Sequence, residues 1–340
     1  MTDLRGGLIG CGFFARNHLY GWQHVEGADI VALCDLDHPR AQAYAEEFGI
    51  RAAHSSAEEM LESESLDFVD IVTQPATHRE LVELAAAHGT HVICQKPLAP
   101  SLEEGRAMVR ACREAGVRFM VHENFRWQTP MRAMKEATKG LGDLFYGRVA
   151  FRSAFDVYTD QPYLATDERF IIYDLGVHLL DLARFFMGDV NKLYCRTQRA
   201  NERIRGEDVA TITLELESGA TCVVEMSYFS KLEEELFPQS LPHLEGTGGS
   251  ATMGPNYQLT RVGGEGVTRR HVPPSTFPWS TSPIEVIQES VVAIQQHWAD
   301  CLRHDREPET SGEDNLKTLE LVFGAYESAE RGEPYRVGGV

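Results

Sequence analysis

Hydrophobic positions in the first third of the chain form short continuous runs separated by stretches with helical periodicity. The apolar runs lie at residues 4–9, 30–34, 68–72, 91–94 and 118–121. A first helix is expected to reach about residue 25, and further helical patterns follow at 39–48, 56–63, 77–88 and 101–115. Strands this apolar, each separated by a helix, are typical of a parallel sheet covered on both faces. The pattern therefore predicts a doubly wound α/β fold.

The pattern changes after residue 123. Strand signals now follow one another at 148–157, 190–200, 209–216, 221–230, 256–262 and 267–272, with hairpin turns at 217–219 and 246–249. Helices are expected at 173–187, 284–303 and 313–331, and irregular loops at 158–170 and 231–245. Strands in succession predict an open, mostly antiparallel sheet packed on helices, an α+β layer. We expect two domains, residues 1–123 and 124–340.

The helix expected at 173–187 is apolar almost all the way round. Asp174, His178 and Asp181 interrupt its apolar surface at positions i, i+4 and i+7, which places them on one stripe. Buried charge without a partner is costly, so this stripe must face polar groups. Two interpretations follow: a structural hydrogen-bond network in the core, or the wall of an active site.

A glycine-rich turn follows the first strand. Gly10-Cys11-Gly12-Phe13-Phe14-Ala15 has the spacing G-x-G-x-x-A between a strand and a helix, which suits close approach of the backbone to a pyrophosphate. Asp35 ends the second strand, 25 residues beyond Gly10. A carboxylate there accepts ribose hydroxyls and repels a 2′-phosphate, so NAD is favoured over NADP, although Arg40 could accommodate a phosphate. The alternative is a glycine turn that binds nothing.

Two later strand ends carry polar residues. Thr73-Gln74-Pro75-Ala76-Thr77-His78 follows one apolar strand, and Gln95-Lys96-Pro97 follows another. Ligands of parallel sheets bind at the carboxyl ends of the strands. Lys96 is therefore a candidate active-site residue, against the alternative of an ordinary solvated lysine.

Composition narrows the choice of partner. The formal net charge of −19 disfavours nucleic acid and anionic membranes, and a neutral small molecule is the expected substrate. Seven scattered cysteines without a Cys-x-x-Cys pair indicate reduced thiols in the cytoplasm. No apolar run approaches the length of a membrane span, and no signal peptide is evident. No ligand spacing demands a metal, although His18, His122 and Asp174 could be mistaken for a metal set.

Together these segments resemble the glucose–fructose oxidoreductase/inositol dehydrogenase (Gfo/Idh/MocA) family along nearly the whole chain. The resemblance rests on the glycine turn and on Thr73–His78, Lys96-Pro97, Asp174-x-Gly176-x-His178-x-x-Asp181, Leu244-Glu245-Gly246-Thr247-x-Gly249 and the segment from Arg303 to Gly332. It implies a Rossmann domain followed by an open-sheet domain whose outer face forms a homodimer or homotetramer. Gln95-Lys96-Pro97 and Glu123–Gln128 are similar to the branch that oxidises D-apiose. Gln95 is a departure, because the family usually has Glu before this lysine.

The resemblance also implies roles for individual residues. Lys96, Asp174 and His178 would be catalytic. NAD would contact Gly10, Gly12, Phe13, Phe14, Ala15, Asp35, Thr73, Gln74, Pro75, His78, Gln95 and Lys96. The sugar would contact Lys96, Asn124, Arg126, Tyr173, Asp174 and His178.

The expected reaction is NAD-dependent oxidation of a sugar hydroxyl, with the anomeric C1 of an aldose such as D-apiose as first choice and a lactone as product. His178 would be the base, because an imidazole titrates near neutral pH. Asp174 would hold its tautomer, with Asp181 as a second candidate, and Lys96 would donate to the reacting oxygen. The alternatives are a polyol or inositol dehydrogenase, an NAD-dependent glycoside hydrolase of the same family, and a non-catalytic NAD-binding protein.

Overall fold

The computed structural model describes residues 3–338, which divide into two compact units. Of the described residues, the first unit holds 3–124 and 290–319, and the second holds 125–289 and 320–338. The expected boundary at 123/124 lies one residue from the first crossing. The expectation that everything after it forms one continuous domain differs from the structure, because residues 290–319 return to the first unit. A helical pattern at the end of a chain does not reveal which sheet it covers.

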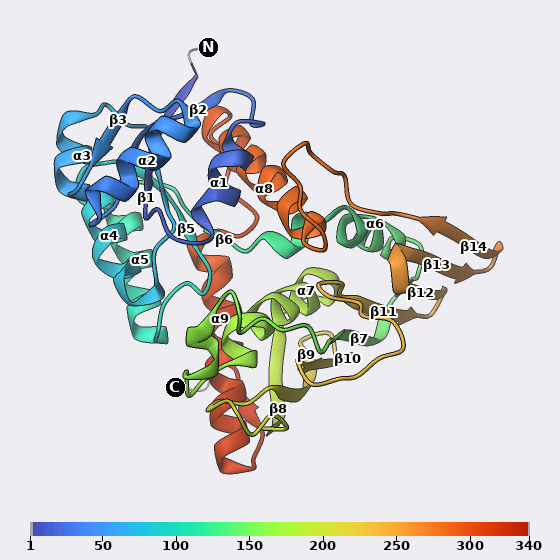
Figure 1. Cartoon of the computed structure of the whole chain (residues 1–340). Helices are drawn as coiled ribbons and strands as arrows, with labels where there is room; N and C mark the ends of the chain where they lie inside the picture. The colour runs from blue at the N-terminus through green and yellow to red at the C-terminus, as the bar shows by residue number, and fades with distance from the viewer. Residues whose placement is uncertain (1–2, 339–340) are drawn as a thin grey trace. The chain divides into compact units, whose positions relative to one another are not determined.

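The first unit contains a six-stranded sheet in the order β3-β2-β1-β4-β5-β6 with every pair parallel (Figure 1). This confirms the doubly wound fold. Its strands are β1 (Leu4–Ile9), β2 (Ala28–Cys34), β3 (Ala52–His54), β4 (Phe68–Ile71), β5 (His91–Gln95) and β6 (Phe119–His122). Its intervening helices are α1 (Ala15–Trp22), α2 (His38–Phe48), α3 (Ala57–Ser63), α4 (Pro75–Ala87) and α5 (Leu102–Ala115). Strand β3 escaped prediction because three residues are too few to form an apolar run.

Local signals explain where two of these helices begin and end. Asp37 caps α2 by accepting from the main-chain N–H of Arg40, and Ser101 caps α5 by accepting from that of Glu104. Both helices end at a glycine in the left-handed region, Gly49 and Gly116. The helices therefore end where the sequence predicts.

The long helix α8 (Glu285–Arg303) contributes its residues from 290 onward to the first unit. The indole of Trp298 is fully buried and meets the ring of Phe68 edge to face, at 6.4 Å between centroids. Gly21 of α1 has no room for a side chain, because a Cβ there would lie 2.3 Å from the Gln295 side chain. Close packing of α1, β4 and α8 thus builds one side of this unit's core.

The second unit contains a nine-stranded sheet in the order β14-β13-β12-β11-β7-β10-β9-β8-β15. Only β7 and β10 pair in parallel, so the sheet is mostly antiparallel, as predicted. Its strands are β7 (Leu144–Arg152), β8 (Val190–Gln198), β9 (Val209–Leu216), β10 (Thr221–Ser227), β11 (Leu241–Gly246), β12 (Gly249–Gly254), β13 (Gln258–Gly263), β14 (Gly266–His271) and β15 (Tyr335–Arg336).

Strands β11, β12 and β15 and helix α6 (Thr129–Thr138) of this unit were not predicted. Strand β11 lies partly in the segment expected to be irregular, and Pro242 within it conceals the strand pattern. Strand β12 pairs with it across the turn at 246–249, which is confirmed. Helix α6 was missed entirely.

The expected helix at 173–187 has two parts. A π-helical turn at Ile172–Gly176 leads into α7 (Val177–Met187), and most side chains of both parts are buried. Gly147 of β7 and Gly176 allow this close packing, because a Cβ at either position would crowd Met187 or Met226. The last helix, α9 (Gly312–Arg331), begins in the first unit and ends in the second. Within residues 3–338, no helix is long and apolar enough to cross a membrane.

Candidate active site

The glycine turn has the geometry that a dinucleotide requires. Gly10 lies in the left-handed region with φ +100°, and a Cβ there would lie 2.8 Å from the carbonyl oxygen of Val72. Gly12 differs, because a Cβ built on it meets no atom within 4 Å. Gly10 thus shapes the turn, and Gly12 leaves its surface open to a ligand. Ala15 is fully buried at the start of α1, and Phe13 is 63% exposed beside the turn.

Asp35 fastens this turn from the end of β2. Its Oδ2 accepts from the main-chain N–H of Cys11 at 2.7 Å, and its Oδ1 accepts from that of Asp37 at 2.8 Å. The Arg40 guanidinium lies 3.8 Å from Asp35 Oδ1 and 3.0 Å from Asp37 Oδ2. Two carboxylates therefore hold Arg40, and a phosphate placed at Asp35 would meet negative charge. The arrangement favours a ribose with free hydroxyls.

Lys96 follows directly on β5 and is half-buried. Its main-chain N–H donates to Oε1 of Gln95 at 2.7 Å, and its peptide bond to Pro97 is cis. Nε2 of Gln95 faces the His18 ring at 2.9 Å. Gln95 was expected among the cofactor ligands, but both ends of its amide are turned to the protein.

His78 requires a similar correction. It was expected to contact the cofactor, yet it is fully buried, and its ring nitrogens lie 3.0 Å from the carbonyl oxygen of Leu98 and 3.1 Å from that of Thr73. Burial lowers the pKa of this imidazole, while the carbonyl contacts oppose that shift. His78 thus joins the Thr73 segment to the turn after Lys96. Thr73 receives a hydrogen bond from Thr77 at 2.8 Å, Gln74 is exposed, and Pro75 begins α4.

In the second unit, the π-helical turn carries Asp174 at a half-buried position. Single π-helical turns are rare and are frequent at functional sites. The Asp174 charge acts on its neighbours: burial first, and then this charge, raises the pKa of both Asp167 and Tyr163. The side chains of Tyr163 and Asp167 therefore lie within electrostatic range of the Asp174 carboxylate.

Glu207 holds the start of this turn. Its carboxylate accepts from the main-chain N–H groups of Phe170 and Ile172, and from the Tyr326 hydroxyl at 2.7 Å. The first N–H groups of a helix have no partner within the helix, and Glu207 supplies one. Tyr173 lies in the same turn, and its N–H donates to the Tyr326 oxygen at 3.2 Å.

His178 is 5% exposed and lies flat against Phe125. The ring centroids are 3.8 Å apart and the planes differ by 3°. Such stacking fixes the plane of the imidazole. Asn124 and Phe125 belong to a short helical turn at Asn124–Trp127. Asn124, an expected sugar ligand, is buried in the first unit and donates to the Ser290 hydroxyl at 2.6 Å.

Arg126 and Asp181 form a buried bidentate ion pair. Arg126 Nε and Nη2 lie 2.6 Å and 2.7 Å from the two Asp181 oxygens. Arg126 was expected to bind sugar hydroxyls and Asp181 was a second partner for His178. The structure instead commits two N–H groups of Arg126 and both carboxylate oxygens of Asp181 to each other. Asp181, one of the three polar residues predicted to share a stripe on this helix, therefore has a structural role as the partner of Arg126.

Several contributing residues were not predicted: Phe125, Glu207, Tyr163, Asp167 and His18. Glu207 lies on a loop before β9 and belongs to no recognisable sequence motif. Phe125 offered a weak signal, since it lies within the segment 123–128 that was compared with relatives. Spacing alone cannot show that these residues touch the site.

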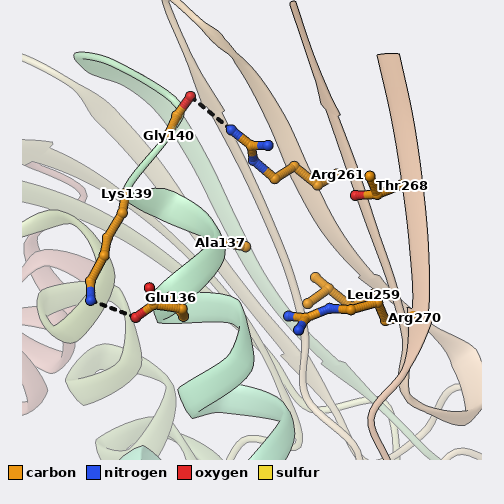
Figure 2. A pocket seen from close by; sticks show the side chains of 8 residues that line it. All are labelled: Glu136, Ala137, Lys139, Gly140, Leu259, Arg261, Thr268 and Arg270. Atoms are coloured by element: carbon orange, nitrogen blue, oxygen red, sulfur yellow. Dashed lines mark hydrogen bonds and ion pairs between the residues drawn. The ribbon is translucent and has the colours of Figure 1, made fainter. Parts of the chain in front are cut away.

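A separate cavity of about 370 Å³ lies in the second unit, between the end of α6 and strands β13 and β14 (Figure 2). Lys139 is paired with Glu136 at 2.5 Å, and Arg261 donates to the Gly140 carbonyl at 3.1 Å. None of the predicted site residues lines this cavity, so it is not the candidate active site. Across the described part of the chain, no group of three His, Cys, Asp or Glu side chains is arranged to hold a metal ion.

Replacing Arg126 with Met should lower the free energy of unfolding by about 3–5 kcal/mol, because it leaves the Asp181 carboxylate buried and unpaired. The double substitution Arg126→Met with Asp181→Leu should recover most of this loss. Urea unfolding measures both. Arg152→Met is the matched control: it breaks a half-exposed pair with Glu225 and should cost at most about 1 kcal/mol. If Arg126→Met unfolds like the control, the pair does not stabilise the helix.

Comparisons with known proteins agree with this geometry. Residues 4–123 match the model of the GFO/IDH/MocA oxidoreductase family, NAD-binding Rossmann fold, and residues 131–252 match the family's C-terminal domain. The chain is 52% identical to a D-apiose dehydrogenase of Paraburkholderia graminis over 330 residues, 96% of this chain and 88% of that protein. It is 49% identical to a D-apiose dehydrogenase of Rhizobium rhizogenes, covering 100% of this chain and 99% of that one.

A solved structure shows the same fold. An oxidoreductase from Agrobacterium radiobacter, crystallised in complex with NAD+, L-tartaric acid and magnesium, superposes with a TM-score of 0.98 at 50% identity, covering 99% of both chains. Its ligands are properties of that protein, whereas the shared fold and the identities along the full length are properties of both. The chain therefore belongs to the Gfo/Idh/MocA family of NAD-binding oxidoreductases.

Proposed function

We propose that this chain is an NAD-dependent sugar dehydrogenase that oxidises the anomeric hydroxyl of a branched aldose of the D-apiose type to the lactone. The observation that carries the proposal is the identity of about half of all residues, along nearly the whole chain, with two D-apiose dehydrogenases. In this reaction the C1–H bond breaks, its hydride leaves for the cofactor, the hydroxyl proton leaves for a base, and C1 becomes the lactone carbonyl.

The first unit fits NAD. The open surface at Gly12, the strained turn at Gly10 and the start of α1 suit a pyrophosphate, and the carboxylate of Asp35 suits the ribose. When bound, NAD supplies a carbon that accepts the hydride. The residues of the chain would position the sugar and accept the proton of its hydroxyl.

His178 is the proposed base. A ring with its plane fixed by Phe125 presents its nitrogen in one direction, and an imidazole accepts a proton near neutral pH. Asp174, one turn away on the π-helical segment, would stabilise the imidazolium that forms. Lys96 would donate a hydrogen bond to the oxygen of C1 as negative charge develops on it.

The other sugar hydroxyls need polar partners. We propose the hydroxyls of Tyr163 and Tyr173 in the second unit, because Tyr163 lies within the field of Asp174 and Tyr173 precedes it in sequence. Asn124 stays on this list as a prediction. Arg126 is dropped, because its side chain is paired with Asp181.

Mixing the purified chain with NAD and D-apiose should produce NADH. The absorbance of NADH measures the rate of this reaction. Lys96→Met and His178→Asn should each reduce kcat by about 100-fold or more, since each removes a group that acts on the reacting hydroxyl. The matched control Lys139→Met removes an exposed, paired lysine and should leave kcat unchanged.

Other results would select other functions. Formation of NADH only with inositol or a linear polyol would indicate a polyol dehydrogenase. Turnover of glycosides without net NADH would name a glycoside hydrolase that recycles NAD. NAD binding without turnover of any of these compounds would contradict enzymatic action on sugars.

We also propose that the chain forms a homodimer or homotetramer through the nine-stranded sheet. Three large apolar side chains are exposed on its strands: Phe145 on β7, Val262 on β13 and Val267 on β14. Light scattering should give two or four times the chain mass of 38.0 kDa. A single-chain mass at micromolar concentration would contradict the proposal, and Phe145→Glu with Val267→Glu should weaken the assembly.

A reducing, cytoplasmic location is consistent with the cysteines. All seven are buried free thiols, and burial raises the pKa of Cys34 to about 11. Fractionation of the producing cells tests this location.

A further inference from the structure

A continuous chain of hydrogen bonds runs through the buried interior of the first unit and ends at the main chain of Lys96. His18 Nδ1 lies 2.7 Å from Asp70 Oδ2, and Gln95 Nε2 lies 2.9 Å from His18 Nε2. Gln95 Oε1 then accepts from the Lys96 N–H at 2.7 Å. Asp70 and His18 are fully buried and Gln95 is nearly so. Three separate elements, β4, α1 and β5, supply the three side chains.

The chemistry of these groups allows one arrangement of protons. The main-chain N–H of Lys96 can only donate, so the Gln95 oxygen must face it and the amide nitrogen must face His18. An amide nitrogen can only donate, so His18 Nε2 must be the unprotonated nitrogen. The ring proton is therefore on Nδ1 and is donated to Asp70. The carboxylate selects the tautomer, and the tautomer selects the orientation of the amide.

This arrangement is a poor choice for stability alone. Asp70 Oδ1 is buried without a hydrogen-bond partner, while Oδ2 accepts from both His18 and the Trp22 indole at 2.7 Å. A buried carboxylate in this state costs desolvation that apolar side chains of similar volume would avoid. The position of this chain of hydrogen bonds points to a use beyond packing, because it ends at the main chain of the lysine proposed to act on the reacting oxygen.

We propose that His18 is a positioning residue for Lys96, acting through Gln95 in the tautomer that Asp70 selects. The proposal rests on the proposed function, in which Lys96 acts on the reacting oxygen. The Gln95 side chain folds back on the next peptide group, and a long side chain holds such a position only when its far end is fixed. His18 fixes that end, and so fixes the peptide plane from which the Lys96 side chain projects.

The proposal also accounts for an amide at position 95. A carboxylate there would place a second acceptor against the unprotonated nitrogen of His18, and no hydrogen bond would form between them unless His18 took up a second proton. Gln95 and a neutral His18 are thus a matched donor and acceptor. Replacement of Gln95 with Glu should therefore disturb Lys96 despite its nearly identical shape.

The test compares His18→Asn with Trp22→Phe. Asn keeps a donor near Asp70 but offers nothing to Gln95, whereas Phe at position 22 removes a hydrogen bond to the same Asp70 oxygen outside the chain that leads to Lys96. In NAD-dependent oxidation of D-apiose, His18→Asn and Gln95→Glu should each lower kcat by roughly 10- to 100-fold, as expected for a misplaced catalytic group, with KM for NAD within about threefold. Trp22→Phe should keep kcat within about twofold of the unchanged protein.

Two spectroscopic measurements need no turnover. Nitrogen NMR of histidine-labelled protein should show His18 with its proton on Nδ1, and exchange of the Lys96 amide hydrogen should accelerate in His18→Asn but not in Trp22→Phe. The proposed role of His18 would be overturned if His18→Asn and Trp22→Phe had equal kcat values, or if the proton of His18 were on Nε2. If the unchanged protein oxidises no sugar, the proposed function fails, and the exchange of the Lys96 amide hydrogen alone tests the role of His18. Faster exchange in His18→Asn supports that role, and unchanged exchange overturns it.

Discussion

The hydrogen bond between Asp70 and His18 constrains the buried polar groups in the interior of the first unit. Buried polar groups must find partners, and this contact decides which nitrogen of the ring remains an acceptor. The orientation of Gln95 and the main chain at Lys96 follow from it. His78 supports the same turn from the end of the neighbouring parallel strand β4, by joining Thr73 to Leu98. Hydrogen bonds from the interior of the unit therefore hold these loops at the carboxyl edge of the sheet.

In the second unit, charged side chains provide the partners of buried polar groups. Arg126 neutralises Asp181 on α7, Glu207 satisfies the first N–H groups of the π-helical turn, and Phe125 fixes the plane of His178. A helix buried on nearly every side needs such partners for each polar group that it carries. Asp174 is half-buried, and its charge adds to the effect of burial in raising the pKa of the neighbouring Asp167.

The sequence predicted the parallel sheet, the glycine turn and the family because each is encoded locally. The spacing from Gly10 to Ala15 and the apolar strands before and after it are readable without tertiary contacts. The stripe on 173–187 was found, but its members could not be told apart. Asp181 and Asp174 have the same side chain, and only the position of Arg126 makes one of them structural.

Other features depend on distant residues and had no local signal. His78 and Gln95 lie in segments that border a cofactor site, yet their polar ends turn inward. The π-helical turn depends on Glu207, more than 30 positions away. The return of residues 290–319 to the first unit depends on packing of α8 against α1 and β4, which periodicity alone does not specify.

The central claim is that hydride leaves the anomeric carbon of an aldose for NAD. The most direct measurement uses D-apiose carrying deuterium at C1 and follows the mass of the NADH formed. The account predicts that the label appears in NADH and that kcat or kcat/KM falls relative to unlabelled sugar. Unlabelled NADH formed at an unchanged rate would contradict it, because the hydride would then come from another carbon.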